Sequence, residues 1–466
     1  MSESTSAEQF KLVSIEMTAD RFAQQTPLKF AGDGVPNPIA IEFNIFENIT
    51  KPYLTGSLVL QDDGDLYRKL NIQGTEKITV RYKPRELSNG LSASDPEVKK
   101  TFYIANIKKA VKYNDYTSVL FINLIEDIGY FDKIQTFSKS YDGKGEQIIE
   151  NIISDKFKRR VNKTLAKSSH QKPFRYIVPY QSPLDACGTV LSKMTTNMGS
   201  PYFLFSTVSN NNFVLSDLES IMSQDAFNKG KPYVYSQGQI NSDATTFEDQ
   251  IYAAHHFDTT NSEDTLRLAQ SGAVAAKYGT FNTTTSQKHD TVIDMSDVIN
   301  KMIASGSLPN DQKSVQIDTK FKPNPDGSPE VLNQFQARYI FDVSSSPYPL
   351  SKSYLGFSEE QQLVDYDLRI VRQALLKHLT KNVYLINLVG FVFNTNSDKT
   401  TVGRTIEIKV FKNEILEPGR GPADPADEKR SGKYIILSKR HMFNITNETH
   451  IVSIEVGRVS NPEVQK

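Results

Sequence analysis

Apolar and polar residues alternate in several short segments of the first 130 residues. In residues 76–82, Ile78, Val80 and Tyr82 fall on one face of an extended chain, and more polar residues fall on the other. The same reasoning predicts further strands at residues 10–17, 39–45, 55–60, 102–111 and 117–125. Little helical pattern interrupts them, so residues 1–130 are expected to form a small antiparallel barrel or sandwich.

Beyond residue 130 the pattern becomes a mixture of helical and extended segments. Isoleucines recur at the spacing of one helix face, and Ser182 and Pro183 form a favourable cap and first-turn pair. The predicted helices are residues 145–156 and 184–194, and the predicted strands are residues 202–208 and 213–215. Residues 131–245 are therefore expected to form an α+β domain.

A second β-rich unit is predicted from residues 246–295 and 361–466. Apolar residues at steps of three and four from Val364 to Leu379 predict one amphipathic helix. Strands are predicted at residues 251–258, 278–284, 288–295, 383–393, 405–411, 434–439 and 451–459. Residues 296–360 are rich in Ser, Pro and Asn and are expected to be a long, partly irregular insertion.

The composition argues against several classes of protein. Lys plus Arg and Asp plus Glu both number 54 among 466 residues, so the basic excess typical of nucleic-acid binding is absent. Cys187 is the only cysteine, so neither an intrachain disulfide nor a thiolate metal site is expected. The sequence has no signal-peptide pattern and no apolar run of bilayer length. We therefore expect no membrane contact, no sequence-specific nucleic acid, and assembly in a reducing cytoplasm.

Motifs for hydrolysis or nucleotide binding are missing from the sequence. The G-x-S-x-G turn that exposes a nucleophilic serine does not occur. Gly419-Arg420-Gly421 is followed by Pro422, which has no N–H for a phosphate. The H-E-x-x-H spacing is also absent, and the adjacent His255 and His256 would point to opposite faces of a strand. The seven histidines are His170, His255, His256, His289, His378, His441 and His450.

The acidic and thiol groups give no stronger candidate for a site. Asp62-Asp63-Gly64-Asp65 is the densest acidic segment, but its place between a strand and a short helix is typical of a turn or cap. Its spacing does not match a calcium loop. His378 and Cys187 lie on or beside apolar helix stripes, where core positions are expected. We assign no catalytic, cofactor-binding or metal-ligating residue, and we expect no cofactor and no enzymatic activity.

A series of segments covers most of the chain apart from residues 296–360. In chain order they are Ile49–Leu60, Leu70–Val80, Ser182–Leu184, Tyr202–Phe205, Phe213–Leu218, Thr265–Lys277, Arg369–Leu375, Ile386–Gly390, Ser431–His441 and Thr449–Val456. Each segment is weakly specific, but in this order they resemble the tail-tube-like baseplate hub proteins of contractile-tailed bacteriophages.

The resemblance implies two tail-tube-like antiparallel β-barrels, the first in residues 1–130 and the second in residues 246–295 and 361–466. It further implies a homotrimer whose six barrels form a pseudo-hexameric ring between the six-fold tail tube and the three-fold central spike. The implied partners are the tail tube protein and the central spike protein, with baseplate wedge and tape-measure proteins as further candidates. The implied location is the tail baseplate of the virion.

Two loops are candidates for contacts with neighbouring ring layers, Glu86–Lys99 and Glu417–Arg430, although plain solvated loops explain both sequences equally well. Two other functions stay open at this point. One is a tail-associated cell-wall hydrolase, which needs an acid–base or metal constellation. The other is a trimeric receptor-binding tail protein, which commonly shows short β-repeats or a glycine-rich shaft.

Overall fold

The structure is a computed structural model, and it describes most of the chain. The described residues are 9–19, 27–63, 68–69, 71–84, 97–112, 116–170, 173–235, 250–261, 265–283, 286–308, 320–321, 330–331, 335–344, 359–393, 398–411, 426–427 and 430–459. Most of the predicted loop Glu86–Lys99, most of Glu417–Arg430 and the segment Gly419–Gly421 lie outside these residues.

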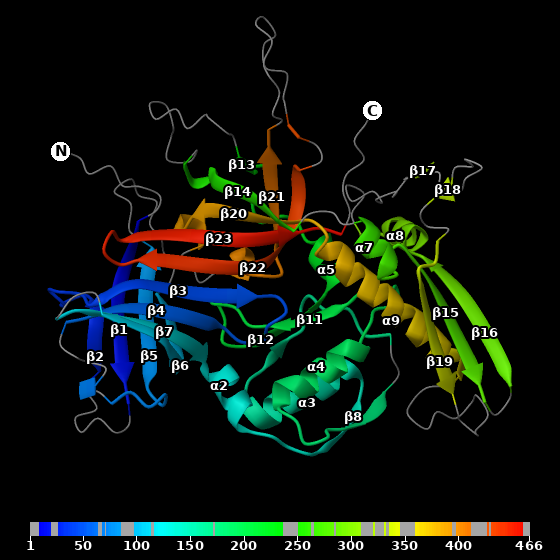
Figure 1. The fold of residues 1–466 in the computed structure, drawn as a ribbon, viewed down its shortest axis with the longest axis horizontal. Helices are drawn as coiled ribbons and strands as arrows, with labels where there is room; N and C mark the ends of the chain where they lie inside the picture. The colour runs from blue at the N-terminus through cyan, green and yellow to red at the C-terminus, as the bar shows by residue number, and fades with distance from the viewer. Residues whose placement is uncertain are drawn as a thin grey trace, which may run out of the picture.

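A thirteen-stranded sheet joins the two ends of the chain (Figure 1). Every pair of neighbours on its main path is antiparallel. In spatial order the path is β14 (Ala254–Asn261), β20 (Val383–Val389), β23 (Thr449–Gly457), β22 (Gly432–Asn444), β3 (Ala40–Asn48), β4 (Thr55–Asp62), β7 (Ser118–Glu126), β6 (Val98–Lys112), β5 (Lys77–Pro84), β1 (Phe10–Thr18) and β2 (Leu28–Gly32). Off this path, β21 (Thr405–Val410) pairs with β22 and with β13 (Tyr233–Tyr235).

The strands β1–β7 enclose a core of their own. Alternate residues point inward, as in β5, where Ile78, Val80 and Tyr82 are all buried. The strands curl, so that β2 at the end of the path comes back to the start of β3. The Ile39 amide, just before β3, donates to the Phe30 carbonyl of β2 at 2.9 Å. Phe443 of β22 also enters this core, with its ring centroid 4.6 Å from that of Tyr82. The first β unit is therefore completed by the last part of the chain.

A mixed α+β region lies below the sheet in Figure 1 and has a separate core. Two helices each turn an apolar stripe toward this core. One helix contributes four isoleucines, and the other contributes Cys187 and Val190. Its elements are α2 (Asp127–Ile134), β8 (Ser140–Gly143), α3 (Gly145–Phe157), β9 (Val161–Asn162), β10 (Phe174–Ile177), α4 (Pro183–Lys193), β11 (Tyr202–Phe205) and β12 (Phe213–Asp217). The next helix, α5 (Leu218–Ser223), buries its apolar residues in a different core.

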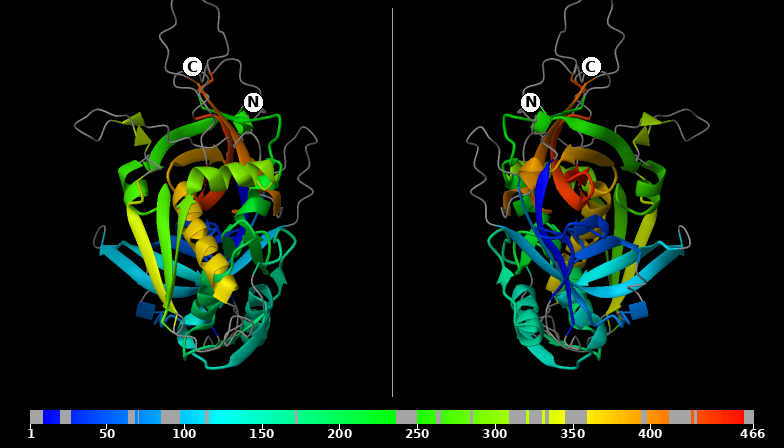
Figure 2. Two further views of the ribbon diagram at one scale, coloured as in Figure 1. Left: turned by 90° about the vertical axis from the view of Figure 1, so that its right-hand side faces the viewer. Right: turned by 90° about the vertical axis from the view of Figure 1, so that its left-hand side faces the viewer.

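The core shared by β13, β14, β20, β21, β23 and the start of β22 defines a second β unit, and a three-stranded sheet beside a long helix adjoins it. The sheet consists of β16 (Gln287–Asp294), β15 (Ala275–Asn282) and β19 (Arg338–Ser344) in that order, with β15 and β19 parallel. In the end-on view of Figure 2, left, this sheet stands next to α9 (Glu359–Leu379). The remaining elements are α7 (Thr265–Gln270), α8 (Met295–Ala304), β17 (Lys320–Phe321), β18 (Glu330–Val331), and the short helices η3 (Phe391–Phe393) and η4 (Asp398–Thr400).

The structure confirms the β-rich class, with a large antiparallel sheet and few helices, and it confirms the helices predicted at 145–156, at 184–194 and near 364–379. No closed barrel is found within the described ranges, so the two-barrel detail is not confirmed. Helix α8 was not predicted, although Met295, Ile299 and Met302 are buried at helical spacing behind the cap Asp294. Strand β19 was not predicted either, because its partner β15 lies more than fifty residues away.

Within the described ranges, no helix is both long and apolar enough to cross a membrane.

Two glycines in the α+β region should respond oppositely to alanine. Gly199 has φ +82°, and an added Cβ would lie 2.7 Å from Val371 of α9, so Gly199→Ala should destabilise the fold by about 1–3 kcal/mol. Gly188 lies exposed inside α4 with open space around it, so Gly188→Ala should stabilise the fold by about 0.5–1 kcal/mol. Thermal unfolding followed by circular dichroism measures both shifts, and equal shifts would contradict the packing of α9 on Gly199.

Candidate functional site

The histidines considered from the sequence lie in different parts of the molecule. His255 and His256 are both exposed at an irregularity of β14, and His170 is exposed beside Asn197. His378 is buried and its Nε2 donates to the Ala273 carbonyl at 2.7 Å, as expected for a histidine at the core edge. The side chain of His289 lies outside the described residues. Among the histidines whose side chains the structure describes, only His441 and His450 come together.

The thiol and carboxyl groups considered from the sequence also lie in positions that serve the fold. Cys187 is buried, and burial first, then the charge of Asp132, raises the pKa of its thiol far above the usual range. Asp62 is buried at the end of β4, and Asp63 accepts from the Gln61 amide, while Gly64 and Asp65 lie outside the described residues. In the described part of the chain, no three His, Cys, Asp or Glu side chains are grouped as metal ligands.

A cluster of buried charged and polar groups lies where β3 meets β22. The Glu47 Oε1 is 3.2 Å from the Lys439 Nζ, and these two side chains are 0% and 2% exposed. The carboxylate also accepts from the Val208 amide at 3.0 Å and from the Val402 amide at 3.4 Å. The Lys439 ammonium in turn donates to the Thr400 carbonyl at 3.1 Å. Glu47 therefore ties the first β unit to the α+β region and to the second β unit at one point.

Two stacked histidine rings extend this cluster along β22 and β23. His441 Nε2 is 3.8 Å from Glu47 Oε1, and His441 Nδ1 is 3.0 Å from His450 Nε2. The two rings are nearly parallel, with an interplanar angle of 8°, and His450 stacks on Phe443 with centroids 4.2 Å apart. The histidines thus continue the aromatic core of the first β unit into the charged cluster.

The electrostatics of the cluster favour a negative Glu47 and neutral histidines. Burial alone would raise the pKa of Glu47, but Lys439, His441 and the Val208 amide lower this pKa to about 2. Burial and the charge of Lys439 lower the pKa of His441 to about 4. Burial, His441 and Lys439 hold the pKa of His450 well below its ordinary value. An acid beside two histidines is an arrangement that could move protons, but each of these side chains is closed to solvent.

A second buried pair fastens the α+β region to the first β unit. The Lys100 Nζ of β6 donates to the Thr207 and Asn210 carbonyls and to the Asn211 Oδ1, at 2.9–3.3 Å. Glu126, at the end of β7, accepts from the Leu54 amide at 2.9 Å and is electrostatically coupled to Lys100. Burial lowers the pKa of Lys100 and raises that of Glu126, and each partner opposes the shift of the other. Both clusters hold parts of the chain together and present no group to a substrate.

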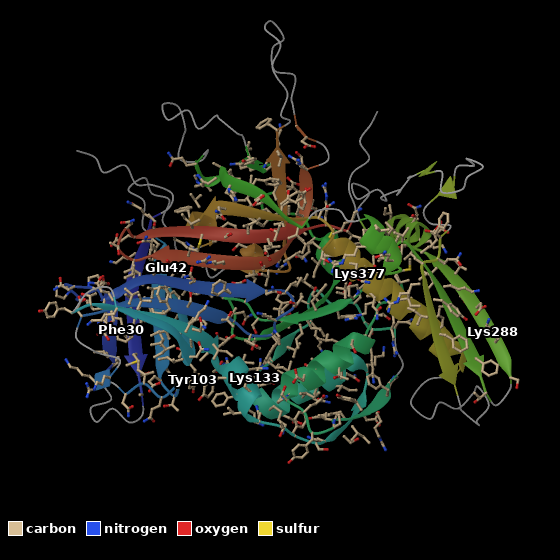
Figure 3. The ribbon with its side chains drawn as sticks, in the orientation of Figure 1. Phe30, Glu42, Tyr103, Lys133, Lys288 and Lys377 are labelled. Atoms are coloured by element: carbon tan, nitrogen blue, oxygen red, sulfur yellow. The ribbon has the colours of Figure 1, made fainter. Side chains whose placement is uncertain are left out.

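An exposed face of the three-stranded sheet is a stronger candidate for contact with another molecule. Val292, Tyr339 and Phe341 are 47–52% exposed, and the strand register places them on one face. The Asp290 carboxylate lies among them and accepts from Lys277, Lys288 and Tyr339 at 3.1–3.2 Å. Figure 3 labels Lys288 at this outer end of the molecule. We call this surface the β16–β15–β19 face.

Gly279 makes this arrangement possible. It lies in β15 opposite Asp290 of β16 and Phe341 of β19. A Cβ at this position would lie 2.2 Å from the Tyr339 hydroxyl and 2.6 Å from the Asp290 carboxylate. The absence of a side chain therefore lets the tyrosine and the aspartate meet over the backbone of the central strand.

Comparisons with known proteins identify the fold. No protein-family model matches this sequence, and no curated protein matches it. The tail protein from Neisseria meningitidis is similar in structure, with a TM-score of 0.50, 10% identity and 96% of each chain covered. A 43 kDa prophage tail protein from Shewanella oneidensis gives 0.48 at 10% identity, covering 96% of this chain and 98% of that one. A Francisella PdpA–VgrG complex gives 0.43 at 11%, covering 98% and 60%. The chain therefore has the fold of the Neisseria tail protein.

The sequence reasoning missed the cluster around Glu47. One signal was present, because Glu47 follows Phe43 and Ile45 at a spacing of two and so occupies the buried face of its strand. Lys439 and His441 precede Phe443 with the same spacing. A charged residue at a core position of an alternating strand indicates a buried partner elsewhere in the chain. The partner itself cannot be identified without the strand pairing.

The buried ion pair should show strong energetic coupling. Glu47→Gln and Lys439→Met are each expected to destabilise the protein by about 3–5 kcal/mol, because each leaves one buried charge without its counterion. The double variant should lose clearly less than the sum. The exposed pair of Arg440 and Glu42 on the same two strands is the control, and its coupling should stay below about 1 kcal/mol. Denaturant unfolding in a double-mutant cycle measures both, and additive losses at Glu47 and Lys439 would contradict the assignment.

The protein should become less stable in acid, beginning at near-neutral pH. Because the folded state holds the pKa of His441 at about 4, the unfolded chain binds protons that the folded chain does not. The free energy of unfolding should therefore fall as the pH drops from about 6.5 to 4, by roughly 3 kcal/mol from His441 alone. Glu47 extends the loss from about pH 4.5 toward 2. Denaturant titrations at several pH values test this.

A matched pair of variants separates this cluster from other titrating groups. His441→Gln should flatten the dependence between pH 6.5 and 4, because it removes the buried ring that resists protonation. His256→Gln, at an exposed position of β14, should leave the dependence unchanged. Equal slopes for the parent protein and His441→Gln would show that other groups cause the acid sensitivity.

Proposed function

We propose that the chain is a structural component of the baseplate hub in a contractile tail, and that it acts without enzymatic activity. In this role three copies form a pseudo-hexameric ring that joins the six-fold tail tube to the three-fold central spike. The observation that carries the proposal is the fold shared with a tail protein over 96% of both chains. The resemblance of the sequence segments to hub proteins gives the more specific role.

The domain organisation that goes with this proposal has two tube-like units in each chain. We assign residues 1–130 to the first unit, 131–245 to an α+β domain, and 246–295 with 361–466 to the second unit, with 296–360 inserted in it. The separate cores of the two β units support this division. Their junction supports the role, since the continuous pairing of β3 with β22 would hold two neighbouring positions of a ring at a fixed angle.

The same proposal sets the partners and the location. The tail tube protein and the central spike protein would lie on opposite sides of the ring, with wedge and tape-measure proteins as further contacts. The ring would lie in the baseplate of the virion after assembly in the bacterial cytoplasm. The clusters around Glu47 and Lys100 suit a static part, because their charges join segments of the chain and are closed to solvent.

A ring of identical copies needs two different contact surfaces on each chain. The β16–β15–β19 face lies at one end of the longest axis and the strands β1 and β2 lie toward the other end (Figure 1). We propose that the face packs against the next copy in the ring. Its half-exposed aromatic side chains support this, because apolar groups gathered on one surface commonly mark an interface.

Electron microscopy of the purified chain, alone and co-expressed with tube and spike proteins, tests the ring. Views down the particle axis should show closed rings with a central hole and three-fold or pseudo-six-fold symmetry. Phe341→Glu should abolish the rings and leave the circular dichroism spectrum unchanged, because it places a charge in the proposed contact. Tyr180→Glu, at a more exposed aromatic residue of the α+β region, is the control. Particles that stay monomeric even with both partners would overturn the proposal.

A further inference from the structure

A large open cavity lies between the α+β region and helix α9. Its volume is about 800 Å³, within the range of ligand-binding pockets. The walls come from the turn between β3 and β4, the end of α2, helix α4, strand β11 and one face of α9. They are apolar at Leu191, Phe203 and Leu376 and polar at Thr189 and Ser192. The cavity therefore offers both apolar surface and hydrogen-bonding groups.

Helix α9 places Arg372 in the wall of this cavity, one turn before Leu376. The Arg372 Nε is fully buried and has no hydrogen-bond partner among the described residues. Burial first, and then the nearby charge of Arg369, lowers the pKa of Arg372. Burial and Arg369 also lower the pKa of Lys193 in the adjacent helix α4. The side chains of Arg369, Arg372 and Lys193 are therefore close enough for their charges to interact.

Of the two carboxylates in the lining, Asp132 is held by groups of this chain, including Lys133, whose Nζ lies 3.8 Å from the Asp132 Oδ2, and the other faces solvent. The Asp132 Oδ1 accepts from the Leu184 amide at 2.8 Å, and its Oδ2 accepts from the Ser182 hydroxyl at 3.2 Å, which together hold the start of α4. Asp185 is exposed. The cationic lining residues are Lys51, Lys133 and Arg372, and Figure 3 shows Lys133 at the end of α2. Three cations against two carboxylates give the lining a formal charge of +1.

A buried guanidinium Nε that has no hydrogen-bond partner is costly, because buried polar groups in proteins nearly always have one. We propose that the cavity binds a glutamate or aspartate side chain presented by another polypeptide, with Arg372 as the receptor for its carboxylate. A guanidinium fits a carboxylate in a bidentate geometry. The apolar walls and the volume suit a segment that also carries an apolar side chain. The inference rests on the proposed function for the source of this segment, a neighbouring tail protein.

The binding itself can be tested on the isolated chain. The probes are blocked pentapeptides with a central glutamate flanked by leucine or phenylalanine, and the same peptides with glutamine in place of glutamate. Calorimetric titration should show binding of a glutamate peptide that weakens with added salt. The matching glutamine peptide should bind about 10- to 100-fold more weakly, because one charge-assisted contact is lost. Equal binding of both peptides, or of neither, would overturn the inference.

Variants connect the binding to Arg372 and exclude a structural role. Arg372→Gln should weaken binding of the glutamate peptide about 10- to 100-fold without lowering the thermal midpoint, because the Arg372 Nε has no hydrogen bond to lose in the part of the chain that the structure describes. Arg175→Gln makes the same change at an exposed arginine of β10 and should leave binding unchanged. A lowered midpoint with unchanged binding would assign Arg372 a structural role and overturn the inference.

Two further outcomes separate this inference from neighbouring possibilities. Inorganic phosphate that binds as tightly as the glutamate peptide, and loses binding in Arg372→Gln, would indicate a general anion site and overturn the assignment to a polypeptide. The peptide titration does not require a ring. Rings without peptide binding would therefore overturn this inference and leave the proposed function standing. Peptide binding by a protein that never forms rings would support the binding site and overturn the proposed function.

Discussion

The pairing of β3 with β22 joins residues as much as 402 positions apart in the sequence, at Asn444 and Glu42. One end of β22 pairs with β21 and the other pairs with β3, so this strand belongs to both β units. Phe443, near its end, fills the core of the first unit, whereas Ile435 and Ile436, near its start, belong to the core of the second. The relative position of the two units therefore depends on the register of one strand pair.

The buried charges at this junction make that register specific. A shift of one residue would move Lys439 and His441 to the opposite face of β22 and leave Glu47 buried without a counterion. Such a buried pair adds little net stability, because desolvation offsets most of the Coulomb attraction. The pair has a larger effect on the alternative registers of the two strands, since each misaligned register leaves an isolated charge in the core. In a part that must hold two β units at one angle, this selectivity matters more than additional stability.

Local patterns in the sequence were enough to predict most strands, the helices α3, α4 and α9, and the β-rich class. They were enough because alternation and helical spacing depend on neighbours in the chain. Pairing between strands that lie far apart in the sequence could not be predicted from such patterns. Strand β19 and the junction of β3 with β22 depend on pairing of this kind. Glu47 shows the limit most clearly. Its place on the apolar face of β3 signals burial, but the amides of Val208 and Val402 that bind it lie 161 and 355 positions away.

Buried charged groups need partners, and this rule, which explains the junction, also distinguishes Arg372 from the buried charges described above. Glu47 has Lys439 and two amides, Lys100 has three oxygen acceptors, and Asp132 has an amide and a hydroxyl. Each of these groups joins segments of the same chain, so the fold itself repays the cost of burying it. The Nε of Arg372 has no such partner among the described residues, and the Arg372 side chain lines an open cavity. Because Glu47, Lys100 and Asp132 all have partners within the chain, the buried Nε of Arg372 suits a partner that the single chain does not contain.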